Sequence, residues 1–347
     1  MSAGTHVVRL GGLSLQLRGR PMIAFAVLLV VAAALFCLSI SAGSTWVAPG
    51  TVVNALGGGG GQAVRYQVLG LRLPRAAIGA LAGAALALAG AFMQSIARNP
   101  LASPDVLGIT TGASVGAAGV FILGWRVFDA PLTVSLPLAA LVGGSLAAAV
   151  VFSVSRGAAG GGMRLILVGI GVNAALLGVL HGLLVVGGTY DVMQVQVWLT
   201  GDLSSDAARI GPLAAVLVVA GLVAVATARS TAAMHLGDDV AHGVGVAVGR
   251  TRGLLLAGSV LAASAAVGAA GPLGFVALSA PQIARFLTRE SRAPLGCTAA
   301  CGAILVLAAD LTARTVFSGS VSVGILTAIV GGPILISLML RRLRSTP

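Results

Sequence analysis

The sequence predicts an all-α, polytopic membrane protein, and three features of the chain support this fold class. Hydrophobic residues make up 57% of the 347 residues, whereas charged residues make up only 9%. The chain contains several windows of roughly twenty successive apolar residues, the length that an α-helix needs to cross a bilayer. The polar segments between these windows are short, so we expect no separate soluble module.

We expect about ten membrane spans within one transmembrane domain, residues 22–341, flanked by tails at 1–21 and 342–347. The first apolar run is longer than an ordinary signal peptide allows, so an uncleaved first helix is expected. The eighth span is short and contains Pro281, so it is either a full span or a half-helix buried by its neighbours. The ten spans lie near residues 22–42, 74–97, 105–124, 133–155, 164–187, 210–228, 253–271, 274–288, 294–316 and 322–340.

The basic residues orient these spans. All 21 basic residues are arginines. With the N-terminus in the cytoplasm, fifteen of them fall on the cytoplasmic side and six on the outer side, in agreement with the positive-inside rule. The arginines are scattered singly among apolar runs, so we expect no binding of nucleic acid. The sequence therefore predicts a multi-pass protein of the cytoplasmic (inner or plasma) membrane with both termini in the cytoplasm.

The residue types exclude several kinds of chemistry. Without lysine, the phosphate-binding loop GxxxxGK[ST] and a Schiff-base lysine are both excluded, so the chain alone is not a P-loop ATPase. It has no HExxH or GxSxG motif, and a membrane-embedded enzyme is poorly supported. Cys297 and Cys301 lie one helical turn apart and are interpreted as small packing residues rather than metal ligands. His181 suits either a polar pathway or a packed, hydrogen-bonded position.

A tight hairpin between two spans is predicted at residues 93–113. Asn99-Pro100 ends one helix, and Ser103-Pro104-Asp105 reads as the start of the next, with a serine N-cap and a proline at the first helical position. Arg98 lies at the turn. The glycines that follow recur every three or four residues, which leaves one helix face without side chains for close approach of another helix: Gly108, Gly112, Gly116 and Gly119.

The most polar internal segment is residues 229–252, on the arginine-rich side. It reads as a short helix over 238–242, followed by a turn broken by glycines. One interpretation is a solvated connector. However, the segment has an apolar side that requires a partner, and a chain without its own ATPase motif is plausibly driven by a separate ATPase that docks here. The apolar side consists of Leu236, Val240, Val244 and Val246.

A set of motifs covering residues 72–342 resembles the permease subunits of FecCD-type ABC importers, which take up ferric siderophores, haem and cobalamin. Gln282, where many members have histidine, is more similar to the ferric-siderophore permeases. The chain departs from the family pattern at Ser320-Val321-Ser322 and at the turn 160–163, which concerns gating. The motifs are LRLPR (71–75), GAALALAGAFMQSIARNPLASPDVLGITTGA (83–113), Trp198 with GDLSS (201–205), LGDDVAHGVGVAVGRTR (236–252), GPLGFVALSAPQIARFL (271–287), ADLTART (309–315) and VGILTAIVGGP (323–333).

The resemblance implies a type II ABC importer permease fold and a transport function without catalytic residues, metal site or cofactor. The implied partners are two ABC ATPase subunits, a second permease subunit that is identical or paralogous, an extracytoplasmic substrate-binding protein and the surrounding lipid. The implied substrate is a ferric siderophore, with haem or cobalamin as the alternative. A passive channel or scaffold, whose cytoplasmic loop binds a partner other than an ATPase, is the less favoured reading.

On the outer face, the resemblance implies that arginines receive acidic side chains of the binding protein. Two flank Pro74 at the start of the second span, where the helix dipole disfavours positive charge. The alternatives are snorkelling to lipid phosphates and, for the third, an intrahelical pair with Asp310. The expected docking residues are Arg72, Arg75 and Arg314.

On the cytoplasmic face, the loop at 229–252 is expected to enter a cleft of the ATPase subunit. Its turn glycines are expected to allow the short helix to fold against the sixth span. The expected coupling residues are Gly237, Asp238, Asp239, Ala241, His242, Gly243 and Gly245.

Within the second span, one helical face carries small and polar residues at spacings of seven and four. A glutamine deep in a span needs a hydrogen-bonding partner. That partner is either another helix, or water in a cavity at the dimer axis, as the resemblance suggests. The expected pathway residues are Gly83, Gly90, Met93 and Gln94.

Overall fold

A computed structural model describes residues 5–344 except 11–12, 44, 125–130, 156–160, 202 and 204. Arg126, Arg156 and Gly160, used above for topology and gating, lie outside the described residues. The all-α prediction is confirmed, and each of the ten expected spans corresponds to one helix. These helices are α1 (Gly19–Ser41), α4 (Leu73–Ala97), α5 (Ile109–Ile122), α6 (Leu132–Ser155), α7 (Gly161–Val186), α9 (Ile210–Met234), α11 (Val248–Ala270), α12 (Val276–Thr288), α13 (Leu295–Thr315) and α14 (Val323–Arg344).

Shorter elements connect these helices. A π-helical segment, Tyr66–Arg72, runs directly into α4. The other connecting elements are α2 (Pro49–Leu56), α3 (Gln62–Arg65), α8 (Thr189–Leu199), a 3-10 turn at Ala207–Arg209 and α10 (Asp238–Gly243).

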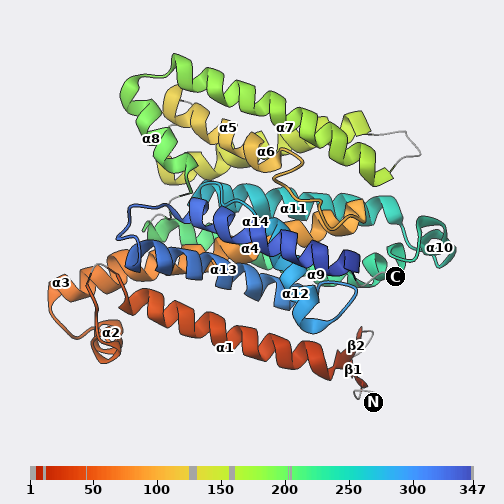
Figure 1. Cartoon of the computed structure of the whole chain (residues 1–347), viewed down its shortest axis with the longest axis horizontal. Coiled ribbons are helices and arrows are strands. Elements are labelled where there is room, and N and C mark those ends of the chain that lie inside the picture. Colours follow the sequence, from red (N-terminus) through yellow and green to blue (C-terminus); the bar gives the residue numbers. More distant parts are fainter. Residues whose placement is uncertain are drawn as a thin grey trace.

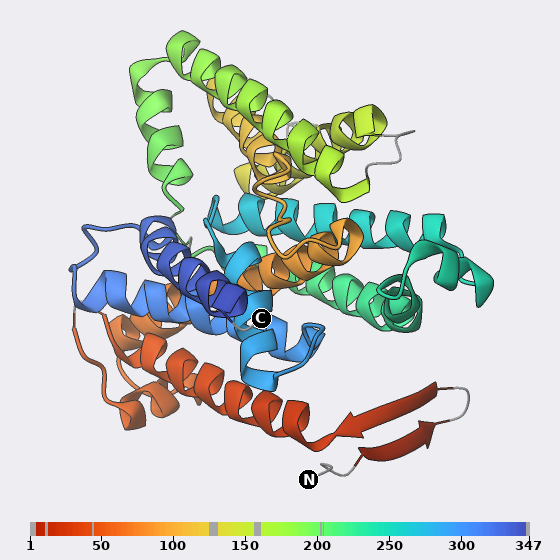
Figure 2. The same ribbon diagram turned by 45° about the vertical axis from the view of Figure 1, so that its right-hand side comes forward.

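The N-terminal tail contains the described strands of the chain. Strands β1 (Thr5–Leu10) and β2 (Leu13–Arg18) pair antiparallel, with Thr5 opposite Arg18 and Leu10 opposite Leu13. This hairpin precedes α1 (Figure 2). It was not predicted, although alternating side chains around a Gly-Gly pair are typical of a hairpin.

Seven helices among the described residues are long and apolar enough to cross a membrane, by length and composition. α5 and the apolar part of α14, Val323–Ser337, are shorter. α12 has 13 residues, which corresponds to about 20 Å and falls short of a bilayer core of about 30 Å. Most of its residues are buried, so α12 is a half-length helix covered by its neighbours.

The helix α4 forms the centre of the molecule. In its most apolar window, 83% of the residues are buried, and it packs against α9, α11, α12 and α13. α5, α6 and α7 lie together on one side of this centre, and α1 lies on the opposite side (Figure 1). Glycine permits the close approach: a Cβ at Gly83 would overlap the carbonyl group of Gly302 on α13.

The hairpin at 93–113 differs from its prediction at one point. Ser103 Oγ accepts the amide of Val106 at 3.2 Å, but the chain makes only a turn there, and α5 begins at Ile109. Gly108, with φ of 75°, lies against Asn173 in the middle of α7. Irregular backbone at membrane depth is tolerated where protein covers it, and this segment explains why α5 is short.

The glycine face of α5 has the predicted function. A Cβ at Gly112 would lie 2.6 Å from the carbonyl oxygen of Gly143 on α6, and one at Gly116 would overlap the carbonyl of Ala139. The two backbones therefore approach closely because α5 carries no side chain at these two positions and α6 carries only Gly143 and small alanines opposite them.

The bundle has two ends, which we name after the short helices that lie there. At the α10 end lie α10, the start of α1 and the end of α14 (Figure 1). At the α2 end lie α2, α3 and α8. The beginning of the first span and the end of the last therefore share one end, as an even number of spans requires.

Candidate docking and transport sites

At the α10 end, α10 is a short helix between two glycines in the left-handed region. Gly237 has φ of 122° and Gly245 has φ of 80°. Ala241 is fully buried against Met234 and Val248, and this contact holds α10 on the bundle.

The outer side of this segment exposes large apolar residues. Leu236, Val240 and Val244 are 71%, 49% and 68% exposed. We call these three residues the α10 patch. They lie beyond the end of the α9 span, and burying such a surface on a partner is favourable. Three of the four residues of the predicted apolar side are therefore exposed, whereas the fourth, Val246, packs against the cluster of Met234, Ala241 and Val248.

Asp238 binds the bundle rather than projecting from it. Its carboxylate accepts hydrogen bonds from Arg98, at the C-terminal end of α4, and from Arg252 Nη2 at 2.9 Å. His242 Nδ1 lies 2.8 Å from the backbone oxygen of Asp238. The turn of the hairpin at 93–113 is thereby linked to α10, a contact that the sequence analysis missed.

At the α2 end, Arg72 is 6% exposed and binds the end of α1. Its Nη1 donates to the carbonyl oxygens of Ile40 and Ser41 at 3.1 and 2.6 Å, and its Nη2 donates to that of Thr45 at 2.6 Å. The last carbonyl groups of a helix lack intrahelical donors and form the negative end of its dipole. The arginine at the start of α4 is therefore stabilised by the end of α1.

Arg75 and Arg314 converge on Asp310, whose side chain is fully buried. Arg75 Nε lies 2.8 Å from Asp310 Oδ1, and Arg314 Nη2 lies 2.9 Å from Oδ2. Arg75 also donates to the carbonyl oxygen of Leu203, and Arg314 to that of Ser39. The side chains of the two arginines are 22% and 14% exposed. The intrahelical pair that the sequence left open is present, and a role in docking stays a prediction.

The predicted pathway face of α4 is covered by other helices of the same subunit. A Cβ at Gly90 would overlap the carbonyl group of Ala277 at the start of α12, and Met93 is fully buried. Gln94 is 6% exposed and has its partners on α12. Its Oε1 accepts from Gln282 Nε2 at 3.1 Å and from Arg285, and its Nε2 donates to the carbonyl oxygen of Leu278 at 3.3 Å.

Gln282 and Arg285 are functional candidates whose contacts the sequence did not predict. They lie three residues apart on one face of α12, and Gln282 also donates to the carbonyl oxygen of Pro100 at 2.9 Å. Three segments therefore meet at Gln94: α4, the hairpin turn and α12. A pathway along this face would require α12 to move.

The helix α7 presents a small-residue face that no other helix of the described residues covers. Gly178 and Gly182 have no atom within 4 Å of an added Cβ, and only 17% of the α7 window is buried. His181 lies on an exposed surface of the same helix. Unlike Gly83 and Gly112, these two glycines do not pack against another helix in the part of the chain that the structure describes.

Among the described residues, no group of three or more His, Cys, Asp or Glu side chains lies close enough together to hold a metal ion. Cys297 and Cys301 are buried in an apolar cluster that includes Ala280 and Ala300.

The helical bundle defines a polytopic membrane protein, and it carries an exposed apolar patch at its α10 end. The FecCD transport family matches residues 28–341, so the chain belongs to this family of transport permeases. It is 35% identical to the "Probable siderophore transport system permease protein YfhA" of Bacillus subtilis (strain 168) over 91% of this chain and 94% of the relative. It is 35% identical to the "Ferric enterobactin transport system permease protein FepG" of Escherichia coli (strain K12), over 88% and 92% respectively.

Permeases named for hemin and for cobalamin match as well. Among solved structures, one titled "An inward-facing conformation of a putative metal-chelate type ABC transporter" superposes with a TM-score of 0.76. The superposition covers 92% of this chain and 99% of the other chain at 23% sequence identity. At this level of identity the match supports the fold.

Proposed function

We propose that the chain is the permease subunit of an ATP-driven importer that moves a ferric siderophore across the cytoplasmic membrane. The observation that carries this proposal is the uncovered α10 patch on a member of the FecCD transport family. The relatives named for siderophores support the substrate. Because this chain has no phosphate-binding loop, ATP hydrolysis would take place in separate ABC ATPase subunits.

The α10 end is proposed to be cytoplasmic. Support comes from the excess of arginines on that side and from the shared location of the start of α1 and the end of α14. The α2 end then faces the outside, where an extracytoplasmic binding protein would deliver the substrate.

ATPase docking is proposed at the α10 segment. The α10 patch supplies apolar area, and His242 and Asp239 are exposed beside it. Asp238 and Ala241 would act by holding α10 on the bundle, since both contact this chain. Gly237 and Gly245 would allow the turns on either side, and the exposed Gly243 would lie within the contact.

A second permease subunit is proposed to cover α7. Gly178 and Gly182 supply a face that a helix can approach closely, and none of the described residues occupies it. The match to both FepG and FepD of Escherichia coli, two permease proteins named for ferric enterobactin, is compatible with a paralogous second permease.

For the binding protein, Arg75 remains the favoured docking residue because it is the most exposed of the three predicted arginines. Arg72 and Arg314 would support it by fixing the ends of α1, α4 and α13. The proposal for the pathway is a movement of α12 away from α4, which would uncover Gly90, Met93 and Gln94. Gly83 is proposed to line the pathway as well, but α13 would have to move from it, because it packs against Gly302.

Reconstitution tests these proposals. The permease, its co-purifying ATPase and the binding protein are placed in proteoliposomes, and uptake of labelled ferric siderophore, haem and cobalamin is compared. ATP-dependent accumulation of the ferric siderophore is expected. Accumulation of haem or cobalamin instead would show that the proposed substrate is wrong. Flux without ATP or any ATPase partner would favour a passive channel.

A further inference from the structure

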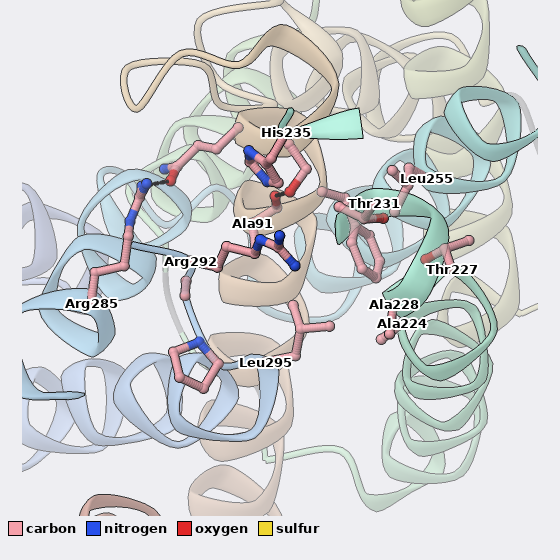
Figure 3. Close-up of a pocket in the computed structure, with 15 residues that line it drawn as sticks. Ala91, Ala224, Thr227, Ala228, Thr231, His235, Leu255, Arg285, Arg292 and Leu295 are labelled. Atoms are coloured by element: carbon pink, nitrogen blue, oxygen red, sulfur yellow. Dashed lines mark hydrogen bonds between the residues drawn. The ribbon is translucent and has the colours of Figure 1, made fainter. Parts of the chain in front are cut away.

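A cavity of about 260 Å³ lies at the α10 end between α4, α9, α11, α12 and the connection from α12 to α13 (Figure 3). None of the described residues that line it is acidic. Its remaining walls are apolar and include Phe92, Leu255 and Leu295. The polar lining residues come from α4, α9 and its C-terminal end, α12 and the connection that follows α12; they are Gln94, Ser95, Thr227, Thr231, His235, Arg285 and Arg292.

The polar wall on α9 repeats every four residues. Thr227, Thr231 and His235 therefore lie on one face of the helix. Thr227 Oγ1 donates to the carbonyl oxygen of Val223. Thr231 Oγ1 is shielded from solvent and has no hydrogen-bond partner among the described residues. A buried hydroxyl without a partner is costly, so this atom indicates a place for a ligand atom.

Two guanidinium groups face this wall from the opposite side (Figure 3). Arg292 Nη2 donates to the carbonyl oxygen of Ala232 at 2.9 Å, and Arg285 binds Gln94. A guanidinium carries five N–H donors, so these bonds leave donors for a ligand on Arg292. Burial and then the nearby guanidinium groups of Arg292, Arg98 and Arg285 lower the pKa of His235. The charged side chains that line the cavity are arginines.

We propose that this cavity binds a phosphate group, with Arg292 and Thr231 as its donors and Arg285 as a further positive charge in its lining. Arginine matches the geometry of phosphate oxygens, and the apolar walls are suited to cover hydrocarbon attached to the phosphate. The same chemistry has two sources at a membrane surface: the headgroup of an anionic phospholipid and free inorganic phosphate. This site is separate from the α10 patch and does not depend on which substrate is transported.

The test compares the full-length permease in nanodiscs of phosphatidylcholine with nanodiscs that also contain phosphatidylglycerol. A second arm adds sodium phosphate to the phosphatidylcholine nanodiscs and compares it with sodium chloride at equal ionic strength. The readout is the apparent Tm. Phosphatidylglycerol, phosphate or both are expected to raise the Tm of the wild-type protein by a few degrees, because a ligand that binds the folded state stabilises it.

Two variants test whether the increase in Tm arises from binding in the cavity. Thr231→Val keeps the size and charge of the side chain and removes the hydroxyl, and Arg292→Gln removes one charge. Each variant is expected to lose at least half of the increase in Tm. Arg289→Gln is the matched control, since Arg289 is exposed in the same connection and does not line the cavity. Stabilisation by phosphatidylglycerol alone identifies a lipid site, and stabilisation by phosphate alone a site for the free anion. The proposal is overturned if neither raises the Tm, if Thr231→Val retains the full increase, or if Arg289→Gln loses as much as Arg292→Gln.

Discussion

Arg75 of α4 donates to the carboxylate of Asp310 of α13 over 2.8 Å, although 235 positions separate the two residues in the chain. The second oxygen of this buried carboxylate is bound by Arg314. Arg314 also donates to carbonyl oxygens of Ser39 and Ala42 at the end of α1. One acidic residue therefore joins three helices at the α2 end of the bundle.

The first prediction is that Asp310→Ala destabilises the protein by about 3–5 kcal/mol, because it leaves two largely buried arginines without their shared counter-charge. Thermal unfolding of the purified permease in detergent measures the effect. Asp239→Ala is the control, since Asp239 is an exposed carboxylate and surface changes usually stay within about 0.5 kcal/mol. Similar losses in both variants would contradict a special role for the buried network.

The second prediction concerns docking of the binding protein. Arg75→Glu is expected to weaken that docking several-fold, because it places a negative charge where acidic side chains of the partner are proposed to bind. A pull-down with the binding protein measures this on the membrane-inserted fraction, with ATPase co-purification as the check on assembly. Arg65→Glu supplies the control, since Arg65 is exposed at the same end. Unchanged docking of an assembled Arg75→Glu complex would assign Arg75 to the structural network alone.

The third prediction separates contact from backbone strain at the α10 segment. Gly243 has no positive φ and faces open space, whereas Gly245 has φ of 80°. Gly243→Trp is therefore expected to leave the fold and membrane level unchanged, while uptake falls and ATP hydrolysis becomes independent of substrate. Gly245→Ala changes little volume and reports the cost of strain. Normal uptake by Gly243→Trp would argue against this side of α10 as the ATPase contact.

Apolar runs predicted all ten membrane helices because such helices satisfy their own backbone hydrogen bonds and are formed from continuous apolar segments. The predicted start of the third span was less accurate: Ser103 accepts the Val106 amide, but α5 begins six residues after Ser103, at Ile109. A local capping pattern does not report that Asn173 on a distant helix covers this segment.

The candidate sites show the same limit. The apolar side of the α10 segment could be predicted because it depends on residues close in sequence. The partners of Arg72 and Gln94 could not be predicted, since they lie on α1 and α12. Helical spacing identifies a face of a helix without identifying which element covers it. The glycine spacing likewise did not predict which small-residue faces are covered: Gly83 packs against α13, whereas Gly178 faces open space.

The fourth prediction is a pH dependence that arises from His235. Burial and the guanidinium groups of Arg292, Arg98 and Arg285 lower its pKa in the folded protein from the usual 6.5. Below pH 6.5, the unfolded chain therefore binds a proton that the folded chain does not, and the free energy of unfolding decreases as the pH falls towards the folded pKa. The Tm of His235→Gln should decline less between neutral and acidic pH than that of the wild type. His242→Gln, at a histidine of the same end that does not line the cavity, is the control variant.

The last prediction tests whether α12 uncovers the face of α4. Cysteine is placed at Gln94 and Met93 after removal of Cys37, Cys297 and Cys301, and labelling by a water-soluble thiol reagent is compared in resting and transporting proteoliposomes. Gly90 is unsuitable, since any side chain there would overlap Ala277 and force the helices apart. Ala82, fully buried on α4, supplies the control position, Ala82→Cys.

Slow labelling is expected in the resting state, where both side chains are covered. If the face lines the conduit, labelling at Gln94 and Met93 increases during ATP-driven transport, while that at Ala82 stays low. Gln94 should respond first, because it lies at the cavity near the α10 end and its partners Gln282 and Arg285 move with α12. Protection of both positions in both states would instead make this face permanent packing, and the exposed face of α7 would then become the candidate lining of the pathway.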